Sequence, residues 1–279
     1  MGTIGTEIDA KFVLAIGDNF YNTGVTSDTS SRFSTSWSTV YNSGSMKTLP
    51  WYVIAGNHDH EGNVTAEVEF TNLDPTKRWN YPDFFYKKSF SGDGVSIDVI
   101  MIDTVDLCGT NKVQDHGVEG YFDPLPTMDS TAINTNWQWI EDQMAASTAD
   151  YLFIGGHYPV YSVCEHGPTQ TLIDNLQPLL VKYNAHYLSG HDHCLEYFVE
   201  GKVSYILSGT GDECCYSASN SKNKLNPTGA LKFSVSSSNN PNKVTGGFVS
   251  ISTSTTSMIV KYYDQDGNVL YSSPTVPPR

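Results

Sequence analysis

Four short apolar runs, each ending at a glycine, constrain this chain more than any other feature of its sequence. They end at Gly17, Gly56, Gly156 and Gly190. Their unbroken apolar and β-branched character predicts strands buried on both faces, as in a covered parallel sheet. Glycine lets the backbone turn sharply off each strand. Because ligands gather beyond the carboxyl ends of parallel strands, we expect the side chains after these glycines to meet at one site.

Those side chains carry oxygen and nitrogen donors. They are Asp18, Tyr21, Asn57, His157, His191 and His193. A carboxylate can bridge two cations about 3.5–4 Å apart, imidazoles suit Zn, Mn or Fe, and an ionised phenol suits Fe(III). Each residue alone is compatible with an ordinary structural role in a turn or core. Four such strand ends together predict a metal site for two ions.

Length and charge limit the remaining possibilities. The 279 residues, 39% hydrophobic and evenly patterned, favour one domain over residues 1–279. With 30 acidic and 16 basic residues the net charge is −14, which argues against a nucleic-acid partner. No apolar stretch has membrane-spanning length, and the opening MGTIGTEIDAKF shows no secretory signal. We expect a monomer, with Asn63-Val64-Thr65 as a glycosylation sequon on a polar loop.

Alternating apolar runs and helical periodicities predict an α/β fold with a terminal meander. Strands are expected at 12–16, 51–56, 95–104, 151–156, 186–190 and 203–209, and helices within 21–44, 61–90, 133–146 and 171–183, the last with a kink or restart at Pro178. Long loops are expected at 108–131 and 212–245, and Asp266-Gly267 predicts a hairpin.

The motifs around the strand ends resemble a known family. They are GDNFY (17–21), GNHDH (56–60), GGHYPV (155–160), EHGPT (165–169) and SGHDH (189–193). Together they are similar to the motif series of the calcineurin-like metallophosphoesterases, and the Tyr of GDNFY narrows the resemblance to small, tartrate-resistant purple acid phosphatases. The resemblance implies a metallophosphoesterase-type α/β sandwich, with two mixed sheets flanked by helices.

The resemblance also implies a metal centre. Asp18 would bridge Fe(III) and a second divalent ion, which would be Fe, Zn or Mn. Tyr21 and His193 would bind the iron. The second ion would be held by Asn57, His157 and His191.

The implied reaction is hydrolysis of a phosphomonoester by a metal-bound hydroxide. His58 and His166 would lie by the leaving group, orient the phosphate and donate a proton. The substrate would be a small phosphomonoester or a phosphoprotein, and the location secreted or lysosomal/vacuolar. The loop 108–131 matches a region that covers the active site in the family.

The chain departs from the family in two places. The first motif, a GD sequence that supplies an iron ligand, is absent. Glu7 and Asp9 precede the first strand, roughly 20–30 Å from its carboxyl end. We therefore expect an amino-terminally truncated chain or, if it is complete, weak activity. Cys108 also lacks its usual partner, because Gln170-Thr171 follows GPT, and pairing of Cys194 with Cys214 or Cys215 is an open alternative.

The sequence is compatible with two other functions. One is a phosphodiesterase or protein phosphatase of the same superfamily that uses Mn or Zn. Iron content and colour would distinguish a purple acid phosphatase from such an enzyme. The other is a non-catalytic protein that retains metal or phosphate binding, which the absent first motif motivates.

Overall fold

The computed structural model describes residues 1–109 and 130–279. The expected loop 108–131 therefore lies almost entirely outside the described residues. Helix α4 (Thr104–Cys108) ends where that segment starts, and α5 (Ser130–Ala146) begins after it. The helix expected at 133–146 is confirmed and starts three residues earlier.

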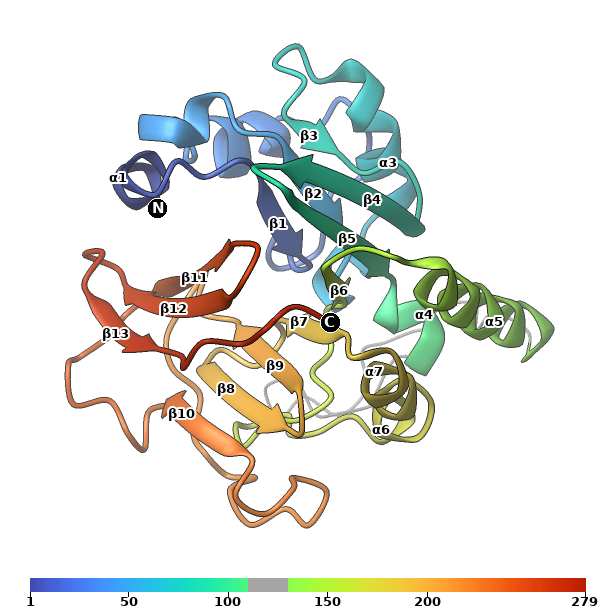
Figure 1. Ribbon diagram of the computed structural model, residues 1–279. Coiled ribbons are helices and arrows are strands. Elements are labelled where there is room, and N and C mark those ends of the chain that lie inside the picture. The colour runs from blue at the N-terminus through green and yellow to red at the C-terminus, as the bar shows by residue number, and fades with distance from the viewer. Residues whose placement is uncertain (110–129) are drawn as a thin grey trace.

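A seven-stranded mixed sheet forms the centre of the molecule (Figure 1). In spatial order it contains β10 (Leu231–Val235), β8 (Leu195–Glu200), β9 (Val203–Ser208), β7 (His186–Ser189), β6 (Tyr151–Gly155), β5 (Val95–Ile102) and β4 (Phe85–Gly92). Strands β5, β6, β7 and β9 run parallel, whereas β4, β8 and β10 pair antiparallel. Strands β6 and β7 are buried along their whole length, as their continuous apolar runs predict.

Two smaller sheets complete the strand content of the described residues. One is parallel and contains β1 (Val13–Ile16), β2 (Trp51–Ile54) and β3 (Trp79–Asn80). The other is an antiparallel meander of β11 (Gly247–Thr253), β12 (Met258–Asp264) and β13 (Val269–Ser272). The predicted fold class is confirmed, but the expected two sheets are three, because β1 and β11 are each the outermost strand of a separate sheet.

Helices cover the sheets. They are α1 (Gly2–Glu7), η1 (Phe33–Ser38), η2 (Gly44–Lys47), α2 (Asn57–His60), α3 (Val64–Leu73), α4, α5, α6 (Gln170–Asn175) and α7 (Gln177–Tyr183). Figure 1 shows α5, α6 and α7 gathered beside one face of the central sheet. There Ile140 and Met144 of α5 join the core cluster of Ile154 and Leu180. Pro178 lies in the first turn of α7, so the expected interruption is a restart.

Two stretches contain strands that the sequence did not predict. The stretch 61–90 contains β3 and β4 besides a helix, and 212–245 contains β10. Strands β4 and β10 each end the central sheet and expose part of their surface, so polar residues interrupt their apolar pattern. Asn63 of the sequon is the N-cap of α3 and its side chain accepts a hydrogen bond from the Ala66 N–H, so Val64 and Thr65 of the sequon lie in the helix.

The cysteine pairing also differs from the alternative left open by the sequence. Cys194 forms a disulfide with Cys164, not with Cys214 or Cys215, which pair with each other. Cys108 has no disulfide partner in the described part of the chain. The physical reason is proximity, because Cys164 and Cys194 follow the neighbouring parallel strands β6 and β7.

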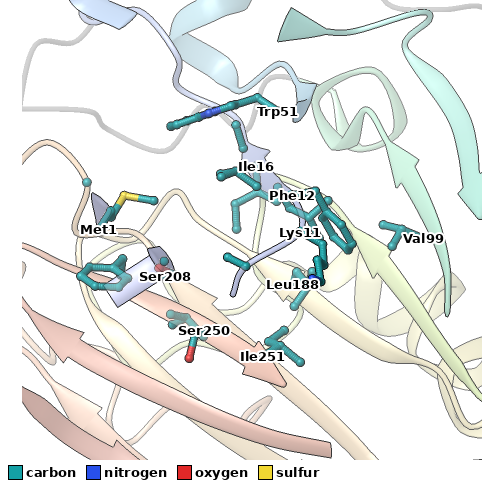
Figure 2. Close-up of a pocket in the computed structure, with 18 of the residues that line it drawn as sticks. Met1, Lys11, Phe12, Ile16, Trp51, Val99, Leu188, Ser208, Ser250 and Ile251 are labelled. Carbon is teal, nitrogen blue, oxygen red and sulfur yellow. The ribbon is translucent and has the colours of Figure 1, made fainter. Parts of the chain in front are cut away.

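A large cavity with apolar and polar walls lies between β1 and β11, and Asp18, Tyr21, His157 and His191 line it as well. Its volume is about 1220 Å³, and every residue of both strands lines it. Figure 2 places Ile16 of β1, Leu188 of β7 and Ile251 of β11 around this space. All four residues of β1 are only half-buried as a result. No described helix is both long and apolar enough to cross a bilayer.

Candidate metal centre

The carboxyl ends of four strands deliver the predicted donors to one place. Asp18 follows β1, Asn57 opens α2 after β2, His157 follows β6 and His191 follows β7. The His157 ring joins two sheets, because its Nδ1 lies 2.9 Å from the Ile16 carbonyl oxygen. Any side chain at Gly56 would collide with Asp18, so this glycine is required for the close approach of the two strand ends.

Asp18 is the centre of this arrangement. Its Oδ2 accepts a hydrogen bond from the Tyr21 hydroxyl at 3.0 Å and lies 3.2 Å from His157 Nε2. Its Oδ1 accepts from the His58 backbone N–H at 3.1 Å. Asp18 and His191 both have left-handed backbones, with φ of 54° and 65°. Such conformations are uncommon for residues with a side chain and cluster at functional sites.

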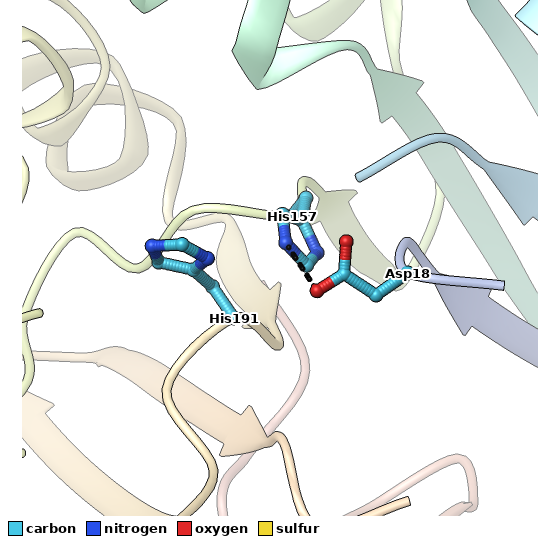
Figure 3. A group of neighbouring side chains, drawn as sticks. All are labelled: Asp18, His157 and His191. Carbon is cyan, nitrogen blue, oxygen red and sulfur yellow. Dashed lines mark ion pairs between the residues drawn. The ribbon is translucent and has the colours of Figure 1, made fainter. Parts of the chain in front are cut away.

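The predicted ligands form two groups around this carboxylate. Tyr21 and His193 make one group, with 3.0 Å between the hydroxyl and Nε2. His157 and Asn57 make the other, with 2.9 Å between Nε2 and Oδ1. His191 belongs beside the second group, since donor atoms of Asp18, His157 and His191 lie within 4.8 Å of one another (Figure 3).

The donor chemistry fits cations. Because His157 Nδ1 faces the Ile16 carbonyl, it carries the proton, and Nε2 then points a lone pair at oxygens of Asn57 and Asp18. A proton or a metal ion placed between these atoms would relieve the repulsion among three electron-rich atoms. Imidazole, carboxylate and amide donors around one point are a set that transition metals accept.

Electrostatics favour a charged Asp18 and a neutral His191, whereas for His157 the Asp18 charge outweighs burial and raises the pKa. Burial acts to raise the pKa of Asp18, but the neighbouring His157 outweighs it and the pKa is lowered. Burial, with a contribution from His166, lowers the pKa of His191 well below its usual range. Burial and the Asp18 charge raise the pKa of Tyr21, so the phenol is protonated until a cation replaces its proton.

The two histidines expected beside the leaving group each lie against a predicted metal ligand. His58 lies against the Tyr21 ring, with 4.7 Å between ring centroids, and its Nδ1 is 2.6 Å from the Asn22 carbonyl oxygen. His166 stacks on His191 with 4.2 Å between ring centroids. The structure thus brings together all eight residues predicted for the site.

Two buried aspartates outside the predicted set of site residues hold these loops. Asp59 accepts hydrogen bonds from the backbone N–H groups of Asn19, Phe20 and Gly56. Asp192 does the same for His166 and Gly167. Their position between paired histidines, in His58-Asp59-His60 and His191-Asp192-His193, was the available signal.

Glu7 and Asp9 do not reach the site. Helix α1 ends at Glu7, before β1 begins, and Asp9 pairs with Lys11 at 2.5 Å. The expectation that neither substitutes for a further metal ligand is consistent with this placement.

Comparison with known proteins agrees with the site. Residues 3–195 match the calcineurin-like phosphoesterase family. The chain is 37% identical to human tartrate-resistant acid phosphatase type 5 over 272 residues, covering 95% of this chain and 79% of that protein. It is 28% identical to purple acid phosphatase 7 of Arabidopsis thaliana, covering 98% and 78%.

A solved structure described as "GAP50 the anchor in the inner membrane complex of Plasmodium" shares the fold. Its TM-score is 0.77 at 19% identity, covering 100% of this chain and 82% of that one. At that identity the likeness concerns the fold alone. The family match and the acid phosphatase relatives settle the classification that the motifs predict. This chain belongs to the calcineurin-like phosphoesterase family.

Proposed function

We propose that this protein is a binuclear-metal acid phosphatase that hydrolyses phosphomonoesters. Membership of the family, with purple acid phosphatases among its relatives, implies a binuclear metal centre. The observation that carries the proposal is the convergence of two donor groups on Asp18, one containing Tyr21 and the other containing His157. A carboxylate shared in this way is the arrangement that two-metal hydrolases use.

The two donor groups suit different ions. The group of Tyr21 and His193 contains an ionisable phenol and is proposed to hold Fe(III), which favours anionic oxygen. The group of Asn57, His157 and His191 offers neutral donors and is proposed to hold divalent Fe, Zn or Mn. When bound, the ions would supply an activated water nucleophile and stabilise negative charge on the phosphoryl oxygens.

The residues of the chain bind and protonate the substrate. His58 lies against Tyr21 and His166 against His191, and both are proposed to orient the phosphate and protonate the leaving oxygen. An imidazolium acid is available in mildly acidic solution. Asp192 holds the backbone of the His166 segment in place, so little ordering is required when substrate binds.

Net charge and the disulfide support the proposed substrates and cellular location. The net charge of −14 argues against nucleic acid, so small phosphomonoesters or phosphoproteins are the proposed substrates of a monomeric enzyme. The buried Cys164–Cys194 disulfide favours an oxidising compartment, in agreement with a secreted or lysosomal/vacuolar location.

The test is to purify the chain and measure bound metals, the visible spectrum and hydrolysis of p-nitrophenyl phosphate on one sample. Two ions per chain including iron, a purple absorption band and activity below neutral pH are expected. Faster hydrolysis of bis(p-nitrophenyl) phosphate by a colourless Mn or Zn protein would favour a phosphodiesterase.

A weakly active or non-catalytic protein is the second candidate. The placement of Glu7 and Asp9 before β1 favours this candidate. Neither residue adds a carboxylate, besides that of Asp18, to the group of Tyr21 and His193. One ion or none, with no hydrolysis of either ester, would support it and contradict the acid phosphatase.

A further inference from the structure

Two segments that border the candidate metal centre are joined to each other. The first is the loop 162–167, which carries His166, and the second is the turn 190–194, which carries His191 and His193. Asp192, fully buried, accepts hydrogen bonds from the His166 N–H at 2.8 Å and the Gly167 N–H at 3.1 Å. The Ser162 hydroxyl also donates to Asp192.

A disulfide links the same two segments. Cys164 lies two residues before His166, and Cys194 follows His193 directly. Both cysteines are 0% exposed and pack with Leu207 and Tyr216. The bond closes a loop across 30 positions of sequence and so removes conformational freedom that hydrogen bonds alone would leave.

The consequence is a fixed place for the His166 ring. It stacks on His191 with ring centroids 4.2 Å apart and meets the Tyr216 ring edge-to-face at 5.4 Å. Tyr216 in turn lies parallel to His193 at 4.4 Å, and its N–H donates to the His193 carbonyl at 3.0 Å. The packing around the disulfide therefore connects His166 to residues of both donor groups.

We propose that the Cys164–Cys194 disulfide is a positioning crosslink that holds the His166 imidazole against the His191–His193 turn. Cys164 and Cys194 touch no substrate and act through His166. The inference rests on the proposed function in one respect, that His166 protonates the leaving oxygen. The placement of the ring itself is a property of the protein and is measurable without metal or substrate.

The kinetic test replaces both cysteines, in Cys164→Ala/Cys194→Ala. General acid catalysis typically contributes 10²–10⁴-fold, so a displaced His166 should lower kcat for an alkyl phosphate by about 10–100-fold. Hydrolysis of p-nitrophenyl phosphate, whose leaving group needs no proton, should fall by less than about threefold, with bound metal unchanged. In a His166→Ala background the cysteine replacements should cause no further loss, which separates positioning from general destabilisation.

The matched control is Cys214→Ala/Cys215→Ala, which removes the neighbouring cysteine pair and leaves both joined segments intact. Chemical reduction would not discriminate, because it opens both disulfides. If the double alanine variant does not fold, Cys164→Ala/Cys194→Val restores buried volume without the crosslink.

A second measurement does not depend on activity. The ring protons of His166, assigned by their loss in His166→Gln, should be shifted by the adjacent rings in the metal-free protein. They should move toward free-histidine values only in the Cys164/Cys194 variants. Unchanged ring signals, or equal losses for alkyl and p-nitrophenyl phosphate, would overturn the inference. A moved ring in a protein that hydrolyses no phosphomonoester would uphold the positioning role and contradict the proposed function instead.

Discussion

At the scale of single residues, the Asp18 carboxylate determines whether the two donor groups can share a site. Asp18→Asn keeps the size of the side chain but removes the charge that would compensate two cations, so we expect bound metal to fall from two ions per chain to one or none. The amide would also direct N–H donors at Tyr21 or His157. Elemental analysis of the purified variant checks this, with Asp142→Asn on the exposed face of α5 as control. Retention of both ions would refute the assignment.

A second residue, Glu196, predicts a pH dependence of stability. Its carboxylate oxygens lie 3.2 Å from the Val163 N–H, and burial, with the nearby Asp192 charge, raises the pKa of Glu196 from 4.5 to about 8. The folded state therefore holds a proton that the unfolded state releases between these values. The stability from this group is complete below pH 4.5 and is lost as pH rises towards 8.

Glu196→Gln should remove this dependence, because the amide is neutral at every pH. Between pH 4.5 and pH 8, the unfolding free energy of the variant should rise relative to that of the native protein by about 1.4 kcal/mol for each pH unit. Urea denaturation of both proteins from pH 5 to pH 8 measures it, and other titrating groups cancel in the difference. Parallel curves would show that Glu196 is already ionised in the folded protein.

At the scale of elements, several strands buried on both faces were predictable, although β8 was missed despite its buried apolar residues. Strands β2, β6 and β7 are almost wholly buried, so their sequences are continuous apolar runs with clear ends at glycine. Strands β4 and β10 were not predicted, because an edge strand with exposed positions accepts residues such as Lys87 and Lys88.

The candidate site was predictable to the same extent as the strands that carry it. Each of its metal donors follows an apolar strand or a glycine turn, and parallel pairing brings together the ends of β1 and β2 and those of β6 and β7. The approach of these two pairs, which lie in different sheets, was not predictable from the sequence. The Cys164–Cys194 pairing was not predictable from spacing, since it depends on β6 and β7 being neighbours in the sheet. The contacts of Asp192 likewise join a loop and a turn about 25 residues apart in sequence.

At the scale of the whole molecule, the cavity between β1 and β11 is the feature least compatible with ordinary packing. Protein interiors leave few voids larger than a water molecule, whereas this one has a volume of about 1220 Å³. Its walls include half-buried β1 and the apolar residues Leu188 and Ile251. Apolar surface that is reachable from solvent is a binding site for hydrophobic dyes.

We therefore expect the native protein to bind 8-anilinonaphthalene-1-sulfonate saturably, with a rise in dye fluorescence at neutral pH in the absence of denaturant. Ile251→Trp places a large ring in the cavity and should reduce the dye fluorescence. The melting temperature should stay equal or increase, because the ring buries apolar surface in space that no other side chain occupies. Val269→Trp, at an exposed position of β13, is the matched control and should leave dye binding unchanged. Equal dye fluorescence in all three proteins, at the level of a compact protein without a cavity, would show that β1 and β11 close over this space in solution.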